Sequence, residues 1–575
     1  MFPRNRLHRR SRPLTVQRRY FRYLPTIALA LSVTMLLAVA GRPVAAQPTS
    51  IPDGAGVWHA SGAHAAVVTG GAEASAAAIE ILKEDGNAVD GTVAALLVLC
   101  VTDSRNFCFG GEVPIMVFDA QRDAVEVLAG IGGAPRLATV EYFEAAGGIP
   151  KTGPQAAVVP GALDAMLVAL DRFGTISFKR AAQPMLQVLA KNPDPWCRDL
   201  ERTMATLIAA EQSTRDRKEG LRRVADEFYR GSIAQRISDW SEANGGLLRR
   251  IDFAMHTTRI DSPVRLAFRD FEVLKCGYWT QGPCLLQSLA LLEGHDLKQL
   301  GHNQVASIHL TVEALKLAMA DRDAYYGDPL FVAVPAARLL APEYSKLRQT
   351  LLNPREASRK IQPGDPLGMR AIRAETAKAM ALATPNRDTT TCLVADRMGN
   401  VVAATPSGWG GVFAGDTGVQ LNTRLQSLNS WRGHPNCVEP GKRPRITLTP
   451  TLVLRDGKPI AAISVAGGDL QDQVSLQVLL NSLEFGLSTP DAVAAPRFST
   501  SHHTGSFGQP APKPASLELN DTIPAEVVVG LRALGHDTQP TKAPTGHPCL
   551  LRIDPQSGKK EAAGDPKANR RAAAY

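Results

Sequence analysis

The stretch DTTTCLVADRMGNVVAATPSG, from Asp388 to Gly408, is the most informative part of the sequence. Two short apolar runs flank the turn RMGN, which predicts a β-hairpin. Thr389 stands at the start of the first run. If the chain were cut between Asp388 and Thr389, Thr389 would gain a free amine, and its hydroxyl nucleophile and its general base would then lie in one residue. The stretch therefore predicts an N-terminal threonine nucleophile, with an ordinary β-branched strand residue as the alternative.

The segments around this hairpin predict strands flanked by helices. Upstream, helical patterns cover 72–103, with a break at Gly86-Asn87, and also 159–178 and 306–329, while 180–270 is helical and charged. Residues 355–387 are charged and contain prolines, as expected of an exposed linker before a cleavage site. Downstream, TPTLVLR and IAAISVAGG form a second strand pair around DGKP. This order predicts a sandwich of sheets covered by helices.

The basic charge of the chain is concentrated at its N-terminus. Of the net charge of +9, residues 1–46 supply nine arginines and no acid, which leaves 9 − 9 = 0 for the remainder. A basic surface for nucleic acid is therefore excluded as the source of the charge. Eight of these arginines precede the apolar run Leu24–Ala40, and VAA follows it. This order predicts a signal peptide over 1–46 and export to the periplasm or the extracellular space. An anchor that stays in the membrane is the alternative; no later segment is apolar enough to span a bilayer.

The eight cysteines do not predict a metal site. No CxxC pair occurs, and none of them stands at metal-ligand spacing from a histidine. We expect neither a metal nor an organic cofactor. An exported protein can form disulfides, but the sequence does not determine which cysteines would pair.

Several motifs, in order, resemble the gamma-glutamyltransferase family of N-terminal-nucleophile hydrolases. They are AEASAAAIEILKEDGNAVDGTVAA, the FGG turn before IMVFDA, VPGALDAMLVALDRFGT, HLTVEALKLAMADRDAYYGDP, DTTTCLVADRMGNVV, PGKRP at 440–444, AGGDLQDQ from Ala466 and DAVAAPRF at 491–498. They extend over nearly the whole chain after residue 46. TQGPCLLQ near 280 and GGDLQDQ are similar to the divergent, cephalosporin-acylase-like branch of this family.

The resemblance implies an α+β fold, a four-layer αββα sandwich. It implies that the chain cleaves itself before Thr389 into a large fragment, 47–388, and a small fragment, 389–575, which remain together as a heterodimer. Thr389 would then attack an amide or peptide of small size, such as a γ-glutamyl compound like glutathione. Water or an acceptor amine would release the acyl group from the acyl-enzyme.

The resemblance also assigns roles to residues beyond Thr389. Gly467 and Gly468 would offer backbone N–H groups to the oxyanion, where the absence of a side chain allows close approach; a plain turn is the alternative. Ser407 stands at the second hydroxyl, which steadies the amine of the nucleophile. Thr447 would bind a substrate carboxylate. Asp469 either lines a polar substrate pocket or caps the following helix.

Three positions depart from the family pattern. Ile131, Ser427 and Ile446 stand where the family places an arginine, an acid and a serine that hold the glutamyl head. A zwitterionic head needs polar groups to replace its water. The departures favour a different amide donor. A protein of the same fold that binds its ligand without turnover is the alternative.

Overall fold

The computed structural model describes residues 57–373 and 389–575, apart from Trp409 and Pro544. The predicted signal peptide and Asp388 lie outside these residues. Two antiparallel sheets of seven strands each form the centre of the fold. In spatial order, the first sheet contains β19 (Arg571–Ala574), β2 (Ala66–Thr69), β8 (Cys392–Ala395), β9 (Val401–Ala404), β3 (Val113–Asp119), β4 (Ala124–Gly130) and β5 (Arg259–Asp261). The second contains β1 (His59–Gly62), β18 (Lys560–Gly564), β17 (His547–Ile553), β13 (Lys458–Ala466), β12 (Thr451–Arg455), β7 (Phe271–Lys275) and β6 (Val264–Phe268).

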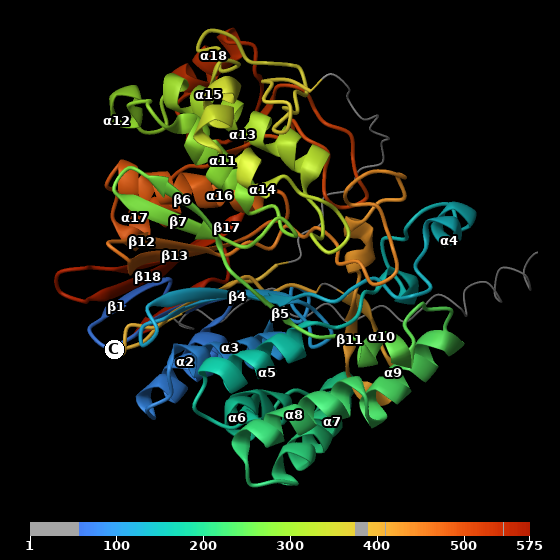
Figure 1. Cartoon of the computed structure of the whole chain (residues 1–575). Helices are drawn as coiled ribbons and strands as arrows, with labels where there is room; N and C mark the ends of the chain where they lie inside the picture. The colour runs from blue at the N-terminus through green and yellow to red at the C-terminus, as the bar shows by residue number, and fades with distance from the viewer. Residues whose placement is uncertain (1–56, 374–388, 409, 544) are drawn as a thin grey trace, which may run out of the picture. The chain divides into compact units, whose positions relative to one another are not determined.

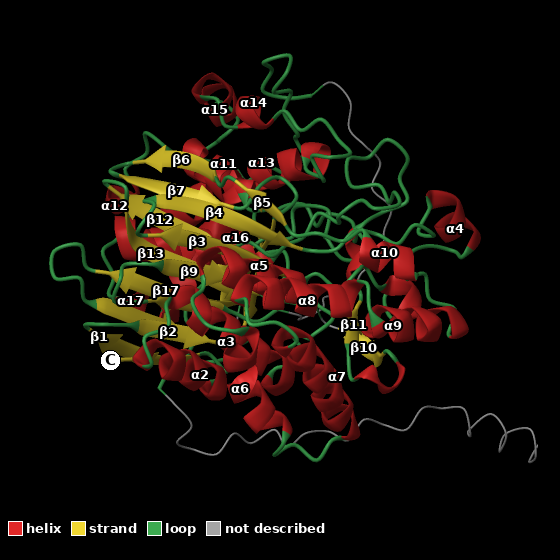
Figure 2. Cartoon of the chain, turned by 60° about the horizontal axis from the view of Figure 1, so that its bottom comes forward, coloured by secondary structure: helices red, strands yellow, loops and turns green. Residues whose placement is uncertain are grey.

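The two sheets pack face to face between two layers of helices (Figures 1 and 2). Buried apolar side chains such as Met116, Leu393 and Leu452 fill the space between the sheets. The outer face of the first sheet is covered by α2 (Ala72–Lys83), α3 (Ala88–Thr102) and α5 (Ala162–Phe173). Packed outside these helices are α6 (Phe178–Leu189), α7 (Pro195–Gln212), α8 (Arg217–Tyr229) and α9 (Ser232–Ala243). The outer face of the second is covered by α11 (Pro283–Leu292), α13 (Val305–Tyr325), α16 (Leu470–Leu479) and α17 (Thr489–Ala494). The predicted four-layer αββα sandwich is confirmed.

Smaller elements lie around these layers. They are the helices α4 (Val140–Ala145), α10 (Arg250–Ala254), α12 (Leu297–Leu300), α14 (Ala336–Leu339), α15 (Pro342–Gln349) and α18 (Ala525–Ala533), and the strands β10 (Gly410–Phe413), β11 (Gln420–Asn422), β14 (Phe498–Ser499), β15 (Ser516–Asn520) and β16 (Asp537–Thr541). A single turn of π-helix, Leu480–Glu484, continues α16.

Most of the predicted elements form. The break between α2 and α3 falls at Asn87, whose side chain accepts hydrogen bonds from the backbone N–H groups of Val89 and Asp90 and so starts α3. Both predicted strand pairs are antiparallel neighbours, β8 with β9 and β12 with β13. The helical prediction for 180–270 is wrong beyond residue 254, because β5 and β6 occupy 259–261 and 264–268. There each strand extends the edge of a sheet, and this pairing outweighs local helical preference.

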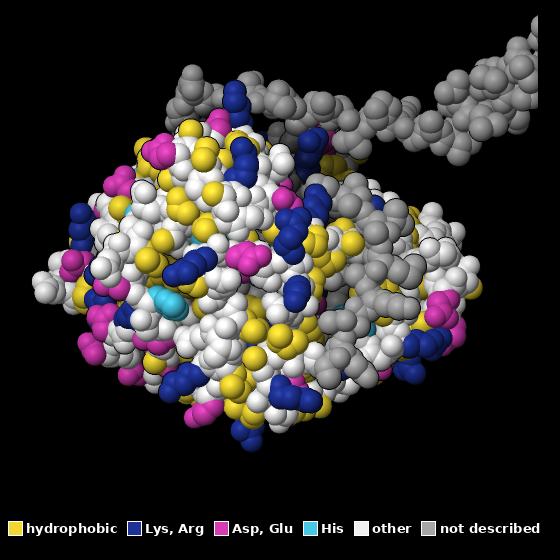
Figure 3. Space-filling model, turned by 90° about the horizontal axis from the view of Figure 1, so that it is seen from above, with side chains coloured by type: hydrophobic (Ala, Val, Ile, Leu, Met, Phe, Trp, Pro, Cys, Tyr) yellow, Lys and Arg dark blue, Asp and Glu magenta, His cyan; other side chains and the backbone are white. Residues whose placement is uncertain are grey.

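The surface and the cysteines agree with an ordinary globular protein. On the face drawn in Figure 3, positively and negatively charged side chains are both scattered among polar and hydrophobic ones. Within the described part of the chain, no helix combines the length and the hydropathy that crossing a membrane requires. All eight cysteines are buried free thiols, so the structure contains none of the disulfides that export would allow.

Candidate active site

Thr389 lies just before β8, at one end of the first sheet. It forms an isolated antiparallel bridge with Ser407, and Ser407 forms another with Glu112. The three residues therefore stand side by side next to the ends of three adjacent strands, β8, β9 and β3. Thr389 is buried, with 3% of its surface exposed. Its carbonyl oxygen accepts a hydrogen bond of 3.2 Å from Arg570 Nη2, which fixes the backbone at the predicted nucleophile.

Gln471, near the start of α16, connects Thr389 to the second sheet. The side-chain amide of Gln471 lies 3.3 Å from Thr389 Oγ1. We assign the amide oxygen to the Thr389 side, because the amide nitrogen then donates to the carbonyl oxygens of Thr447, at 2.8 Å, and Val465, at 3.2 Å. In this orientation the Thr389 hydroxyl donates to Gln471 Oε1. The amide therefore holds the hydroxyl oxygen in one place.

Gly467 and Gly468 form the turn between β13 and α16, immediately before Gln471. Their φ angles are +142° and +59°, which L side chains rarely adopt. A Cβ on Gly468 would also lie 3.1 Å from the ring of Phe507. The N–H groups of Leu470 and Gln471 donate to the carbonyls of the two glycines and close the first turn of the helix. Both conformation and space thus explain the glycine pair, and the turn directly precedes the residue that contacts Thr389.

Asp469 belongs to an ion-pair network. Its carboxylate accepts hydrogen bonds from Arg322 Nη1 at 2.6 Å and from the backbone N–H and hydroxyl of Ser506, at 2.8 and 2.6 Å. Burial opposes ionisation, but Arg322, with help from His503 and Ser506, lowers the pKa of Asp469 below its usual value. Its side chain makes no capping bond to α16. The negative charge of Asp469 is therefore balanced within the protein by the guanidinium of Arg322.

Thr447, the other residue predicted to bind substrate, is buried, and so are Ile131, Ser427 and Ile446, the three residues that depart from the family pattern. Thr447 is 1% exposed, and its hydroxyl has no hydrogen-bond partner among the described residues. The same holds for the hydroxyl of Ser427. Ile131 and Ile446 both pack in the apolar core between the sheets. The structure thus brings Thr389, Ser407 and Thr447 into one region, while the two isoleucines contribute apolar packing.

Arg424 and Glu112 are site residues that the sequence analysis missed. Arg424 Nε donates to Glu112 Oε1 at 2.7 Å, and its Nη2 donates to Ser407 Oγ at 2.9 Å. Both side chains are buried. A buried carboxylate needs a partner, so the lone Glu112 in the apolar stretch FCFGGEVPIMVF is a signal that could have revealed the pair. Through this pair, the hydroxyl beside Thr389 is held by a fixed guanidinium.

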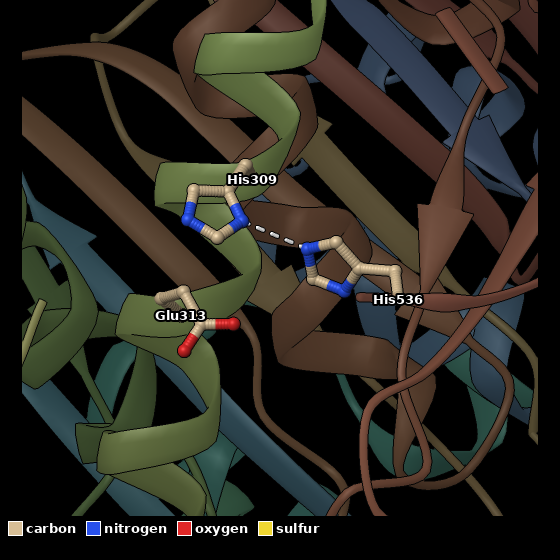
Figure 4. Close-up of side chains that lie close together, drawn as sticks. All are labelled: His309, Glu313 and His536. Atoms are coloured by element: carbon tan, nitrogen blue, oxygen red, sulfur yellow. Dashed lines mark hydrogen bonds between the residues drawn. The ribbon is translucent and has the colours of Figure 1, made fainter. Parts of the chain in front are cut away.

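One group of side chains in the described part of the chain has the composition of a metal site. His309, Glu313 and His536 have ligand atoms within 4.8 Å of one another (Figure 4). Contacts within the protein occupy both nitrogens of His309 and the carboxylate of Glu313, whereas His536 Nδ1 is buried without a partner among the described residues. His309 Nε2 donates to the carbonyl oxygen of Asn353 at 2.7 Å, which leaves Nδ1 to accept from His536 Nε2 at 2.8 Å. Glu313 pairs with Lys316 and accepts from the Ser358 N–H, and an ammonium beside the site disfavours a metal cation.

The chain matches the family model described as Gamma-glutamyltranspeptidase over residues 74–215 and 204–575. It is 29% identical over 535 residues to the glutathione hydrolase proenzyme of Bacillus subtilis strain 168, and the alignment covers 86% of this chain and 89% of the relative. It is also 29% identical over 521 residues to the acylase ACY 1 proenzyme of Pseudomonas sp. strain SE83, with 83% and 88% covered. The solved structure of LmbA2991HD superimposes with a TM-score of 0.81 at 30% identity, over 89% of this chain and 98% of that one.

The family model covers far more than half of the chain, and the fold and the order of motifs agree with it. The chain therefore belongs to the gamma-glutamyltranspeptidase family and is a gamma-glutamyltransferase-like hydrolase or acyltransferase.

Proposed function

We propose that the chain cleaves itself between Asp388 and Thr389 and then acts as an amide hydrolase or acyltransferase through the new N-terminal threonine. The contact between Thr389 Oγ1 and Gln471 carries the proposal, because it fixes a buried hydroxyl at the start of a strand. The freed amine of Thr389 takes the hydroxyl proton as the oxygen attacks the amide carbonyl. The relatives named as proenzymes support processing of this kind.

The groups around Thr389 have distinct roles in this mechanism. Ser407 lies opposite Thr389 and can accept a hydrogen bond from the new amine, while Arg424 fixes its hydroxyl. The turn at Gly467 and Gly468 offers N–H groups to the oxyanion of the tetrahedral intermediate. Expulsion of the amine leaves an acyl ester on Thr389. Water or a second amine then attacks this ester and restores the hydroxyl.

We infer that the acyl donor lacks an α-amino-acid head. Ile131 and Ile446, at two positions where the family binds that head, pack in the core between the sheets. The nearby guanidiniums of Arg424 and Arg322 already pair with Glu112 and Asp469. A zwitterionic γ-glutamyl head would therefore lose its water with little charge to replace it. The similarity to an acylase proenzyme supports the same inference.

The decisive experiment follows processing and activity together in the purified protein. On a denaturing gel we expect two fragments that meet at Asp388 and Thr389, with N-terminal sequencing of the smaller one starting at Thr389. Thr389→Ala should remain one chain without amidase activity. Thr390→Ala is the matched control and should process normally, because the Thr390 hydroxyl points toward Gly70. A single uncleaved wild-type band, or an active Thr389→Ala protein, would contradict the proposal.

A panel of acyl anilides tests the donor. We expect kcat/KM for glutaryl anilide to exceed that for γ-glutamyl anilide by at least roughly tenfold, since unreplaced hydration of one charged group costs more than 1.4 kcal/mol. The reverse order would restore γ-glutamyl compounds such as glutathione as the donor. A processed protein that turns over none of the anilides would favour the binding protein without catalysis.

We also infer export, from the pattern of residues 1–46 alone. If the signal peptide is removed, the larger fragment of the protein isolated from its native source should begin at Gln47. A larger fragment that begins at Met1 and sediments with membranes would favour the retained anchor instead.

A further inference from the structure

A hollow of about 380 Å³ lies beside the loop that follows the C-terminal end of β4 in the first sheet. Arg136, in the loop after β4, and Arg443, in the PGKRP motif, both line it, together with His256 and Asp252. Backbone hydrogen bonds of 2.8 Å join the two loops, from Ala134 to Lys442 and from Gly441 to Ala134. Arg136 and Gly441 are exposed, so the hollow is open to solvent. Its volume falls within the range of small-molecule sites.

In the described part of the chain, neither arginine side chain of this hollow forms an ion pair with an acid, although Asp328, Asp261 and Asp164 interact with Arg443 at longer range. Among the described residues, no carboxylate lies within 4.0 Å of the side-chain nitrogens of Arg136 or Arg443. Arg443 Nη2 donates to the Thr257 carbonyl at 2.9 Å, and its Nη1 is buried without a partner in the described part of the chain. Asp252, the carboxylate in the lining, accepts from the backbone N–H groups of Arg136 and Arg249 at 2.9 and 2.8 Å. Asp328 likewise accepts from a backbone N–H, that of Arg443, at 3.0 Å. Both guanidiniums thus lack an ion-pair partner in the described part of the chain.

His256 adds a further polar group to the wall. It is 7% exposed, stacks against Tyr229, and its Nε2 lies 3.8 Å from Asp164 Oδ2. Burial lowers its pKa to about 4. At neutral pH the imidazole is therefore uncharged and can serve as a hydrogen-bond donor. The lining combines two cations with a neutral donor.

The hollow and Thr389 lie at the same end of the first sheet but on different strands. Thr389 precedes β8, whereas the hollow lies beyond the end of β4 and before β5. Since β9 and β3 separate β8 from β4, and neighbouring strands are about 4.8 Å apart, the β4 end is roughly 14 Å from Thr389. Thr389, Gln471 and the glycine turn do not line the hollow. It is a separate feature of the fold.

We propose that this hollow is a binding site for a small molecule that carries an oxyanion, a carboxylate or a phosphate. A guanidinium presents its N–H donors in a planar fork that matches both groups, and two guanidiniums that form no ion pair within the protein can donate to such a ligand. The site gives a role to Arg443 in PGKRP, a motif that the mechanism at Thr389 does not use. The proposal does not depend on the amidase reaction.

The test is calorimetric titration of the purified wild-type protein with sodium phosphate and, separately, with sodium glutarate, each at constant ionic strength in sodium chloride. We expect saturable binding of at least one anion, and the stronger one identifies the source of the oxyanion. Arg136→Gln and Arg443→Gln should each weaken that binding at least tenfold. Arg432→Gln is the matched control, because Arg432 is an exposed arginine that pairs with Glu141 and Glu144, and it should bind as the wild type does.

Two results would overturn the site. One is the absence of saturable binding of either anion. The other is binding that remains unchanged in both arginine variants, which would place the anion elsewhere. Arg136 is exposed, so its variant should fold even if Arg443→Gln does not, and thermal unfolding checks both. Binding should persist in Thr389→Ala, which separates this site from the nucleophile.

Discussion

The side chains of Thr389 and Gln471 meet at 3.3 Å although 82 positions separate them in the sequence. Thr389 comes from the first sheet and Gln471 from the helix that follows the central strand of the second. The contact therefore depends on how the two sheets pack against each other. It also connects the nucleophile to the glycine turn that precedes Gln471.

We predict that Gln471→Met slows both self-cleavage and turnover about tenfold, because one net hydrogen bond to the Thr389 hydroxyl, about 1–1.5 kcal/mol, is lost while side-chain volume is kept. Gel densitometry over time measures cleavage, and anilide hydrolysis measures turnover. Gln477→Met is the matched control on the same helix. Gln477 bonds to the backbone of Phe498, so its loss should lower the free energy of unfolding and leave kcat unchanged. Equal effects of the two variants on kcat would show that Gln471 has only a structural role.

The glycine turn leads to a second prediction. Gly468→Ala places a methyl group 3.1 Å from Phe507 on a backbone with φ of +59°. The turn must shift, which misplaces the proposed oxyanion donors, and we expect kcat to fall about 10²- to 10³-fold. Gly486→Ala separates strain from catalysis, because Gly486 has φ of +72° and no atom within 4 Å of the added methyl group. It should cost about 1 kcal/mol of stability and leave kcat intact. A Gly468→Ala enzyme with normal kcat would exclude this turn from the chemistry.

Local pattern predicted much of this fold. Helix spacing and the break at Gly86-Asn87 predicted α2 and α3, and the turns RMGN and DGKP predicted the two hairpins, because each of these features depends on a few neighbouring residues. The order of the strands within each sheet does not depend on neighbouring residues alone. β5 follows a long helical region and joins the edge of the first sheet beside β4, which no local signal specifies.

The site divides in the same way. Thr389 and the glycine pair stand in motifs that can be recognised in the sequence. The pairing of Arg424 with Glu112 joins residues 312 positions apart, and the two meet because the segment before β3 lies beside β11, where Gly110 bridges Leu421. For Asp469 the sequence predicts a substrate-pocket carboxylate or a helix cap; the structure pairs it with Arg322 and shows no capping bond to α16. A carboxylate in a motif does not reveal which cation the fold will place beside it.

The third prediction concerns acid stability and His502. His502 Nε2 donates to the Lys360 carbonyl and Nδ1 accepts from the Ala515 N–H, so both nitrogens are satisfied only in the neutral form. Burial lowers its pKa to about 4, against 6.5 for an ordinary histidine. Between these values the unfolded chain binds the proton and the folded chain does not. His502 therefore stabilises the fold fully above pH 6.5, and this contribution declines as the pH falls toward 4.

The uncleaved Thr389→Ala chain is the background for this measurement, because a single chain can refold. Its free energy of unfolding, from urea titrations between pH 4.5 and 6, should include a slope of about 1.4 kcal/mol per pH unit from His502. His502→Gln should reduce the total slope by that amount, and the two curves should run parallel between pH 7 and 8, where the imidazole is neutral in both states. An unchanged slope would mean that His502 is already protonated in the folded protein, and its hydrogen bond from Ala515 would then have to be absent.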